Sequence, residues 1–243
     1  EPFIWGFDDL EAIFFMTLLL LLYFADIPYL GNEVPFYLCR MTRKIWLAGQ
    51  VVYIVCATAI YTVAILLSTI LICGQRCYVG NIWSETAVKL AFTSAGKKLS
   101  LAASEKTLEL TRPYACMTTI FFLLFAYALV MVLLIFWFRI LWNELAGMIA
   151  GVVFNGISFI FSPGILQKLL GISERKSYLA NVAAGWISPL SHATYHLHNF
   201  GYDRLPSLRD SGIYDMVLVI MLILLNLYSI RTYHFVFDGT GER

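Results

Sequence analysis

Long blocks of consecutive apolar residues restrict the possible folds of this sequence more than any other feature. One block reads MTLLLLLYF, and several blocks of similar character follow it along the 243 residues. A helix needs roughly 20 mostly apolar residues to cross a bilayer. Only 14% of the residues are charged, whereas a soluble domain carries about 25%. We therefore expect an all-α fold class, a polytopic transmembrane helical bundle.

Five apolar segments are candidates for membrane-spanning helices. They lie near residues 13–30, 45–72, 115–138, 145–161 and 213–236. The third and fourth segments are joined so tightly, around Arg139 and Glu144, that they must form an antiparallel hairpin. No internal repeat divides the chain, so we expect a single transmembrane domain over residues 1–243. Because the sequence begins at Glu1 rather than Met, we also expect upstream residues, which would have room for a further span.

A short basic stretch, residues 34–44, separates the first two apolar segments. Pro35 suits the first turn of a helix, and apolar residues follow it at helical spacing beside a basic cluster. This pattern predicts an amphipathic helix on the membrane surface. Such a helix either anchors the joint to lipid headgroups or docks a soluble partner. The candidate docking residues are Val34, Pro35, Tyr37, Arg40, Arg43 and Lys44.

Two polar regions, residues 78–113 and 165–212, are expected on the opposite side of the membrane. Both read as short interfacial helices, although the apolar pieces of the second region also suit re-entrant segments. The two polar regions, counted with Arg76 just before the first, hold more basic residues than the other side, 11 against 6. The compact cluster of Arg40, Arg43 and Lys44 lies next to a span, where the positive-inside rule works best. We therefore place that cluster in the cytoplasm.

Several polar or small residues are candidates for specific roles. His192 and His196 would share one face of a helix and form a possible metal pair, but interfacial polar residues are the simpler interpretation. Asn155 and Asn226 lie inside spans, where hydrogen bonds to neighbouring helices are the favoured role. The spacing of Cys73, Cys77 and Cys116 allows a disulfide without establishing one.

A stripe of small residues on the fourth apolar segment predicts close packing of another helix. Gly147 and Gly151 form a G-x-x-x-G pattern, and Gly156 continues it. The partner helix belongs either to the same subunit, which we favour, or to a second subunit across a dimer seam.

Several motifs are missing from the sequence. It contains no phosphate-binding loop, no H-E-x-x-H zinc motif and no G-x-S-x-G nucleophile motif. No span carries a pair of carboxylates suited to a proton relay. We assign no catalytic residue, metal ligand or cofactor to the chain. Its net charge of +1 suggests no nucleic-acid partner.

Three stretches of the sequence resemble a known family. They are FYLCRMTRKIWLAGQVVY at residues 36–53, AGWISPLSHATYHLHNF at residues 184–200, and the tail IRTYHFVF. In layout and in these stretches the chain resembles a bacterial ATP-binding-cassette (ABC) exporter permease of the type-two class, of the Firmicute kind. The family's coupling-helix pattern falls on Arg40, Arg43, Lys44, Trp46 and Gly49. Gln50 departs from it, since Lys is commoner there.

The resemblance implies a permease subunit with six spans in a bacterial plasma membrane. Two such subunits, identical or different, would pair, and each would dock a cytoplasmic ABC ATPase that binds ATP and Mg²⁺. Residues 34–44 would couple the two proteins, and the chain itself would be a transporter rather than an enzyme. The apolar span walls favour export of an amphipathic, lipidic or peptide-like substrate. The alternative is a membrane scaffold or assembly subunit without transport activity.

Overall fold

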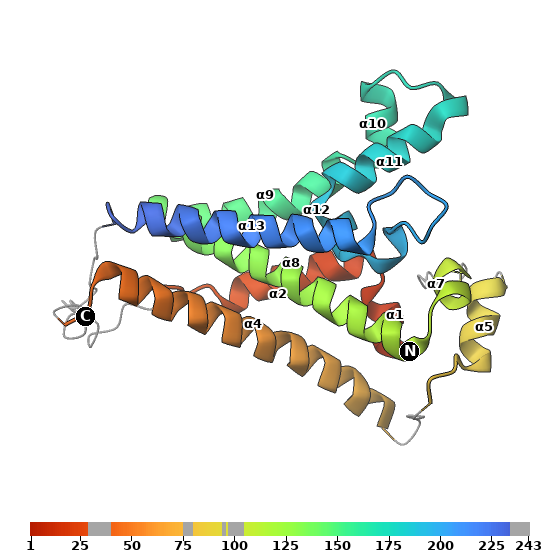
Figure 1. The fold of residues 1–243 in the computed structure, drawn as a ribbon, viewed down its shortest axis with the longest axis horizontal. Coiled ribbons are helices and arrows are strands. Elements are labelled where there is room, and N and C mark those ends of the chain that lie inside the picture. The colour runs from red at the N-terminus through yellow and green to blue at the C-terminus, as the bar shows by residue number, and fades with distance from the viewer. Residues whose placement is uncertain (29–39, 75–79, 94–95, 97–104, 234–243) are drawn as a thin grey trace.

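The computed structural model describes residues 1–28, 40–74, 80–93, 96 and 105–233, and these residues form helices and connecting turns without any strand. A helix covers most of each of the five apolar segments, and the long helices lie side by side with alternating direction (Figure 1). These helices are α2 (Leu10–Tyr23), α4 (Arg43–Cys73), α8 (Pro113–Leu141), α9 (Glu144–Ile160) and α13 (Leu208–Ser229). The expectation of a helical bundle is confirmed.

Three helices in the described part of the chain, α4, α8 and α13, are long and apolar enough to cross a membrane. A fourth span results if α9 and α10 (Pro163–Leu169), which meet at a bend of 71°, are taken together. Helix α2 has 14 residues and therefore extends about 21 Å, less than the roughly 30 Å of a hydrocarbon core. The chain is therefore a helical membrane protein.

Three helix boundaries differ from those expected. Helix α2 ends at Tyr23 rather than near residue 30, and Pro28 follows in a segment where helix cannot continue. Helix α13 runs from Leu208 to Ser229 rather than from residue 213 to 236. Its early start comes from a capping box, in which Ser207 and Asp210 each accept a hydrogen bond from the other's backbone N–H.

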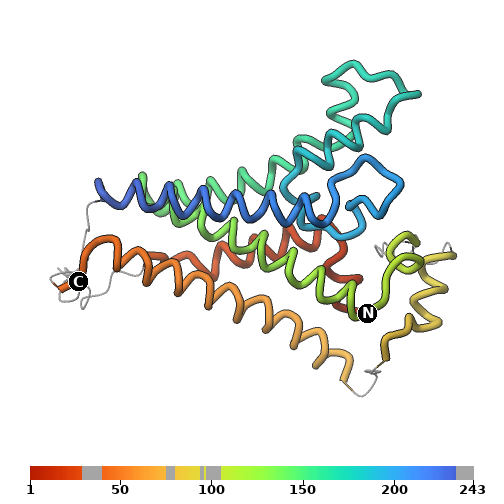
Figure 2. The backbone as a smooth tube through the Cα atoms, in the orientation of Figure 1, coloured from red at the N-terminus to blue at the C-terminus, as the bar shows by residue number. Residues whose placement is uncertain are grey.

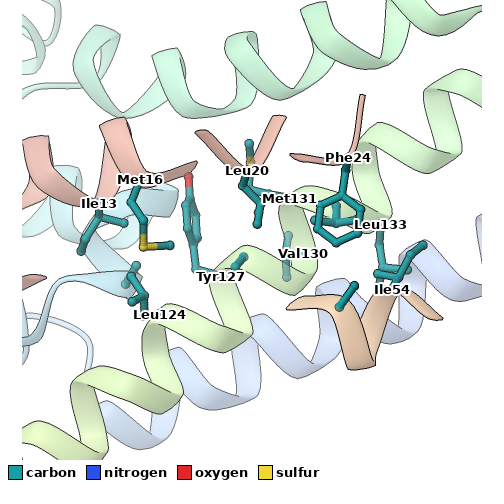
Figure 3. Packing of buried hydrophobic residues seen from close by; sticks show 14 of the residues in the cluster. Ile13, Met16, Leu20, Phe24, Ile54, Leu124, Tyr127, Val130, Met131 and Leu133 are labelled. Atoms are coloured by element: carbon teal, nitrogen blue, oxygen red, sulfur yellow. The ribbon is translucent and has the colours of Figure 1, made fainter. Parts of the chain in front are cut away.

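Helix α8 forms the centre of the bundle, and α2, α4, α9 and α13 all pack against it. Figure 3 shows Leu124, Tyr127 and Met131 of α8 interleaved with apolar side chains of α2 and α4. By contrast, α4 and α13 expose many of their apolar residues, among them Ile60 of α4 and Met216 of α13. A helix that is apolar on its exposed side suits a lipid environment or a second membrane subunit.

Buried amides connect the helices inside the bundle. Tyr127 of α8 donates to Asn155 Oδ1 over 2.6 Å, and Asn155 Nδ2 donates to Thr17 Oγ1 of α2 over 2.8 Å. Asn226 of α13 donates to the carbonyl of Leu133 on α8. The sequence-based prediction of interhelical hydrogen bonds for both asparagines is confirmed.

The small-residue stripe on α9 lies partly against other helices of the same subunit. A Cβ at Gly147 would stand 2.4 Å from Arg139 Cγ and 2.8 Å from the Ile135 carbonyl oxygen, both on α8. At Gly151 a Cβ would stand 2.6 Å from Leu21 Cδ2 of α2. Gly156 has no atom within 4 Å of such a position, so it takes no part in this contact.

We predict that Gly147→Ala destabilises the protein by about 1–3 kcal/mol, since a methyl group there overlaps the α8 backbone. Gly156→Ala on the same helix is the matched control, and it leaves stability unchanged or slightly higher because its methyl group enters open space. Thermal unfolding of the two variants in detergent, followed by tryptophan fluorescence, compares them. Equal unfolding temperatures would contradict the packing role.

Candidate functional site

A basic cluster marks one end of the bundle, where α4 begins and α13 ends (Figure 1). Arg43 and Lys44 belong to the first turn of α4 itself, because Thr42 caps that helix and accepts from Ile45 N. Arg40 lies just before the cap. The other predicted coupling residues, Val34, Pro35 and Tyr37, lie outside the described residues, as do Cys39 and Cys77.

Arg43 connects α4 to the C-terminal end of α13. Its Nη1 donates to the carbonyl oxygens of Ile230 and Arg231, over 3.3 and 2.6 Å, just beyond the C-terminal end of α13. Such carbonyls lack partners within their own helix, so a guanidinium satisfies them well. Arg40 and Lys44 are exposed, and so is Arg43. The predicted basic cluster is therefore a surface cluster in which Arg43 also makes a structural contact.

The joint between α8 and α9 lies at the same end of the bundle. Arg139, in the last turn of α8, is only 4% exposed. Its Nη1 donates to the Phe24 carbonyl over 3.1 Å, and its Nη2 lies 3.1 Å from Glu144 Oε1 in the first turn of α9. The aliphatic part of this side chain packs on Gly147. This joint is therefore held by polar contacts to both α2 and α9.

Short helices cover the opposite end. These are α1 (Pro2–Phe7), α5 (Glu85–Phe92), α7 (Glu105–Leu110), α11 (Ser177–Ile187) and α12 (Pro189–Ala193). Figure 2 shows the N-terminus among them, away from the basic cluster. Lys106 of α7 connects that helix to the loop before α13, because its Nζ lies 2.7 Å from Asp203 and donates to the His198 carbonyl over 2.9 Å.

Three histidines meet other polar residues at this covered end, but they do not share a helix. His192 lies on α12, and His196 lies in a separate 3-10 turn after Thr194, whose extended backbone ends α12. The shared helical face that a metal pair would have required is therefore absent. No group of three metal-ligating side chains occurs within the described ranges.

His192 and His198 instead face one hydroxyl, that of Ser211 in the first turn of α13. His192 Nδ1 and His198 Nε2 each lie 2.8 Å from Ser211 Oγ. On the far side of each ring, His192 Nε2 lies 3.2 Å from the Trp186 carbonyl and His198 Nδ1 lies 3.1 Å from the Tyr195 carbonyl. A carbonyl oxygen only accepts, so each ring must donate there. In the neutral rings both nitrogens that face Ser211 are then acceptors.

One hydroxyl proton cannot satisfy two acceptors, so the neutral cluster lacks one hydrogen bond. Burial lowers the pKa of both His192 and His198, and the Trp186 and Tyr195 carbonyls only partly oppose it. Both rings are therefore neutral near pH 7. The ring of His192 also stacks on Tyr214, with centroids 4.2 Å apart.

His196 makes an ion pair with Asp8, which lies between α1 and α2. Its Nδ1 is 3.1 Å from Asp8 Oδ1, and its backbone N–H donates to the same oxygen over 2.8 Å. Burial lowers the pKa of His196, but the hydrogen bond and the charge of Asp8 outweigh burial, and the pKa is raised overall. The pair holds the start of the chain against the segment before α13.

Sequence reasoning did not identify Asp8, Ser211 or Asp215. Asp8 precedes the first apolar segment, and no local pattern assigns it a partner. Ser211 and Asp215 are four residues apart and share a face of α13 only because that helix starts at Leu208. The capping pattern of Ser207 and Asp210 was the available signal for this earlier start.

Comparison with protein-family models, with curated proteins and with solved structures finds no match for this chain.

We predict that His196→Gln lowers stability by roughly 1–3 kcal/mol at pH 6 and by less at pH 9. The pKa of His196 is raised in the folded state. Its stabilisation is therefore complete below the unfolded pKa of about 6.5 and is lost as pH rises through the folded value. Unfolding temperatures of both proteins across this range test the prediction. A difference that grows with pH would contradict it.

The two histidines around Ser211 have the opposite pH dependence. Since their pKa values are lowered in the folded state, the unfolded chain binds protons first as pH falls below about 6.5, and stability decreases. His198→Gln keeps an acceptor for Ser211 but does not titrate. We expect its unfolding temperature to fall less between pH 6.5 and pH 5 than that of the wild type. An unchanged slope would contradict this assignment.

Proposed function

We propose that this chain is the permease subunit of an ATP-driven ABC exporter in a bacterial plasma membrane. The observation that carries the proposal is the basic end of the bundle, where exposed Arg40 and Lys44 flank Arg43, which bonds α4 to the end of α13. A soluble partner that binds the exposed cations is connected through Arg43 to two long helices. The resemblance of residues 36–53 to the coupling region of such permeases supports the same role.

The exposed helices support assembly with a second membrane subunit. Both α4 and α13 present large apolar side chains outward, including Ile60, Leu71 and Met216. A second permease subunit, identical or different, and membrane lipid would cover these faces. The proposed cargo is amphipathic, lipidic or peptide-like, because the span walls are apolar.

In this proposal ATP and Mg²⁺ bind to the separate ATPase subunit. ATP binding would favour one arrangement of the bundle over another, because a ligand shifts an equilibrium by its difference in affinity for the two states. The contribution of this chain is to transmit that bias. A movement of the partner bound to Arg40 and Lys44 would be transmitted directly to α4. It would be transmitted to α13 through the hydrogen bonds of Arg43.

The test is purification of the tagged chain from the membranes of its native host, followed by assay of ATP hydrolysis in the purified fraction. The Arg40→Gln/Lys44→Gln double variant is expected to lose about tenfold in associated ATPase activity, because docking charges are removed while Arg43 is kept. The matched control is Arg175→Gln/Lys176→Gln, an exposed basic pair that lies away from the basic cluster.

The control pair is expected to retain full ATPase activity. Equal activity in the two double variants would contradict docking at the basic end. If the folded wild-type chain purifies without any ATPase, the permease assignment fails and a scaffold role replaces it.

A further inference from the structure

A cavity lies between the N-terminal half of α8 and the first two turns of α13. Its volume is about 360 Å³, and its walls include Phe122, Phe125 and Ala126 from α8, with Gly212 and Asp215 from α13. Small-molecule sites in proteins have volumes of roughly 300–1,000 Å³ and are mostly apolar with few polar groups. The cavity therefore has the size and the lining of a site for a compact, largely apolar molecule.

Asp215 is the charged residue of this cavity, and the structure gives it no partner. Its side chain is 2% exposed, and neither carboxylate oxygen has a hydrogen-bond partner among the described residues. Ser211, one turn earlier on the same face, is already engaged with His192 and His198. An unpaired carboxylate is costly in an apolar interior, and ionisable residues within spans usually mark functional sites.

We propose that this cavity binds a hydrophobic monocation, an amine or quaternary ammonium with a small aromatic or alkyl body, and that Asp215 pairs with its charge. A cation neutralises the unpaired carboxylate, whereas an anion would be repelled and a neutral molecule without a hydrogen-bond donor would leave Asp215 unpaired. The rings of Phe122 and Phe125 suit a cation further, because aromatic faces attract quaternary ammonium groups. This site goes beyond the proposed export function, since binding requires no ATPase.

The test measures binding of phenyltrimethylammonium to the purified chain in nanodiscs of zwitterionic lipid, by calorimetry and without ATPase or ATP. Benzenesulfonate, a single ring with a head group of opposite charge, is the matched probe. We expect the cation to bind and the anion not to bind. Asp215→Asn, which keeps the shape of the side chain, should weaken cation binding by about tenfold or more. Glu109→Gln, which neutralises an exposed carboxylate at the covered end, should leave binding unchanged.

A second variant keeps the proposal testable if Asp215→Asn does not fold. Ala126→Phe fills the cavity and leaves the carboxylate in place, so it should also abolish cation binding. Wild-type affinity in either folded variant would overturn the proposal, as would equal binding of benzenesulfonate. Because the assay contains no ATPase, the export proposal can fail while this site is confirmed, and the reverse also holds.

Discussion

The hydrogen-bond chain from Tyr127 through Asn155 to Thr17 fixes the interior of this bundle. It joins α8, α9 and α2 inside the bundle, where all three side chains are buried. Polar groups in such surroundings must find one another, because water is absent. The chain therefore sets the position of α2, which is too short to cross a bilayer alone, against the two helices that form the hairpin.

The two ends of the bundle carry different kinds of residues. One end is basic. There Arg43 donates to the carbonyl of Ile230, and Arg139 donates to the carbonyl of Phe24. The other end is covered by short helices and contains the histidine cluster and the Asp8–His196 pair. The proposed docking surface and the polar network thus lie at opposite ends, and α4, α8 and α13 are the physical connection between them.

The helices could be predicted from the sequence because apolar blocks and turn residues act locally. Asn155 was also interpreted correctly, since an amide inside a span has few alternatives. The pair of Asp8 and His196 could not be predicted, because the two residues are 188 positions apart and no local pattern relates them. His192 and His196 do not share a helical face, because the extended backbone at Thr194 breaks the helix between them. Asp215 falls within the expected span over residues 213–236, but no local pattern indicates that its carboxylate is buried without a hydrogen-bond partner among the described residues.

The single hydroxyl between His192 and His198 has a consequence for motion. Rotation about one C–O bond turns the Ser211 proton from one imidazole to the other, and no heavy atom has to move. Helix α13 is thereby bonded in turn to α12 and to the segment that follows the 3-10 turn. The proton therefore has two nearly equivalent orientations, and this freedom leaves conformational entropy at a site whose heavy atoms are otherwise fixed. A small displacement of either ring would favour one of the two hydrogen bonds, and α13 would then be bonded to that histidine alone.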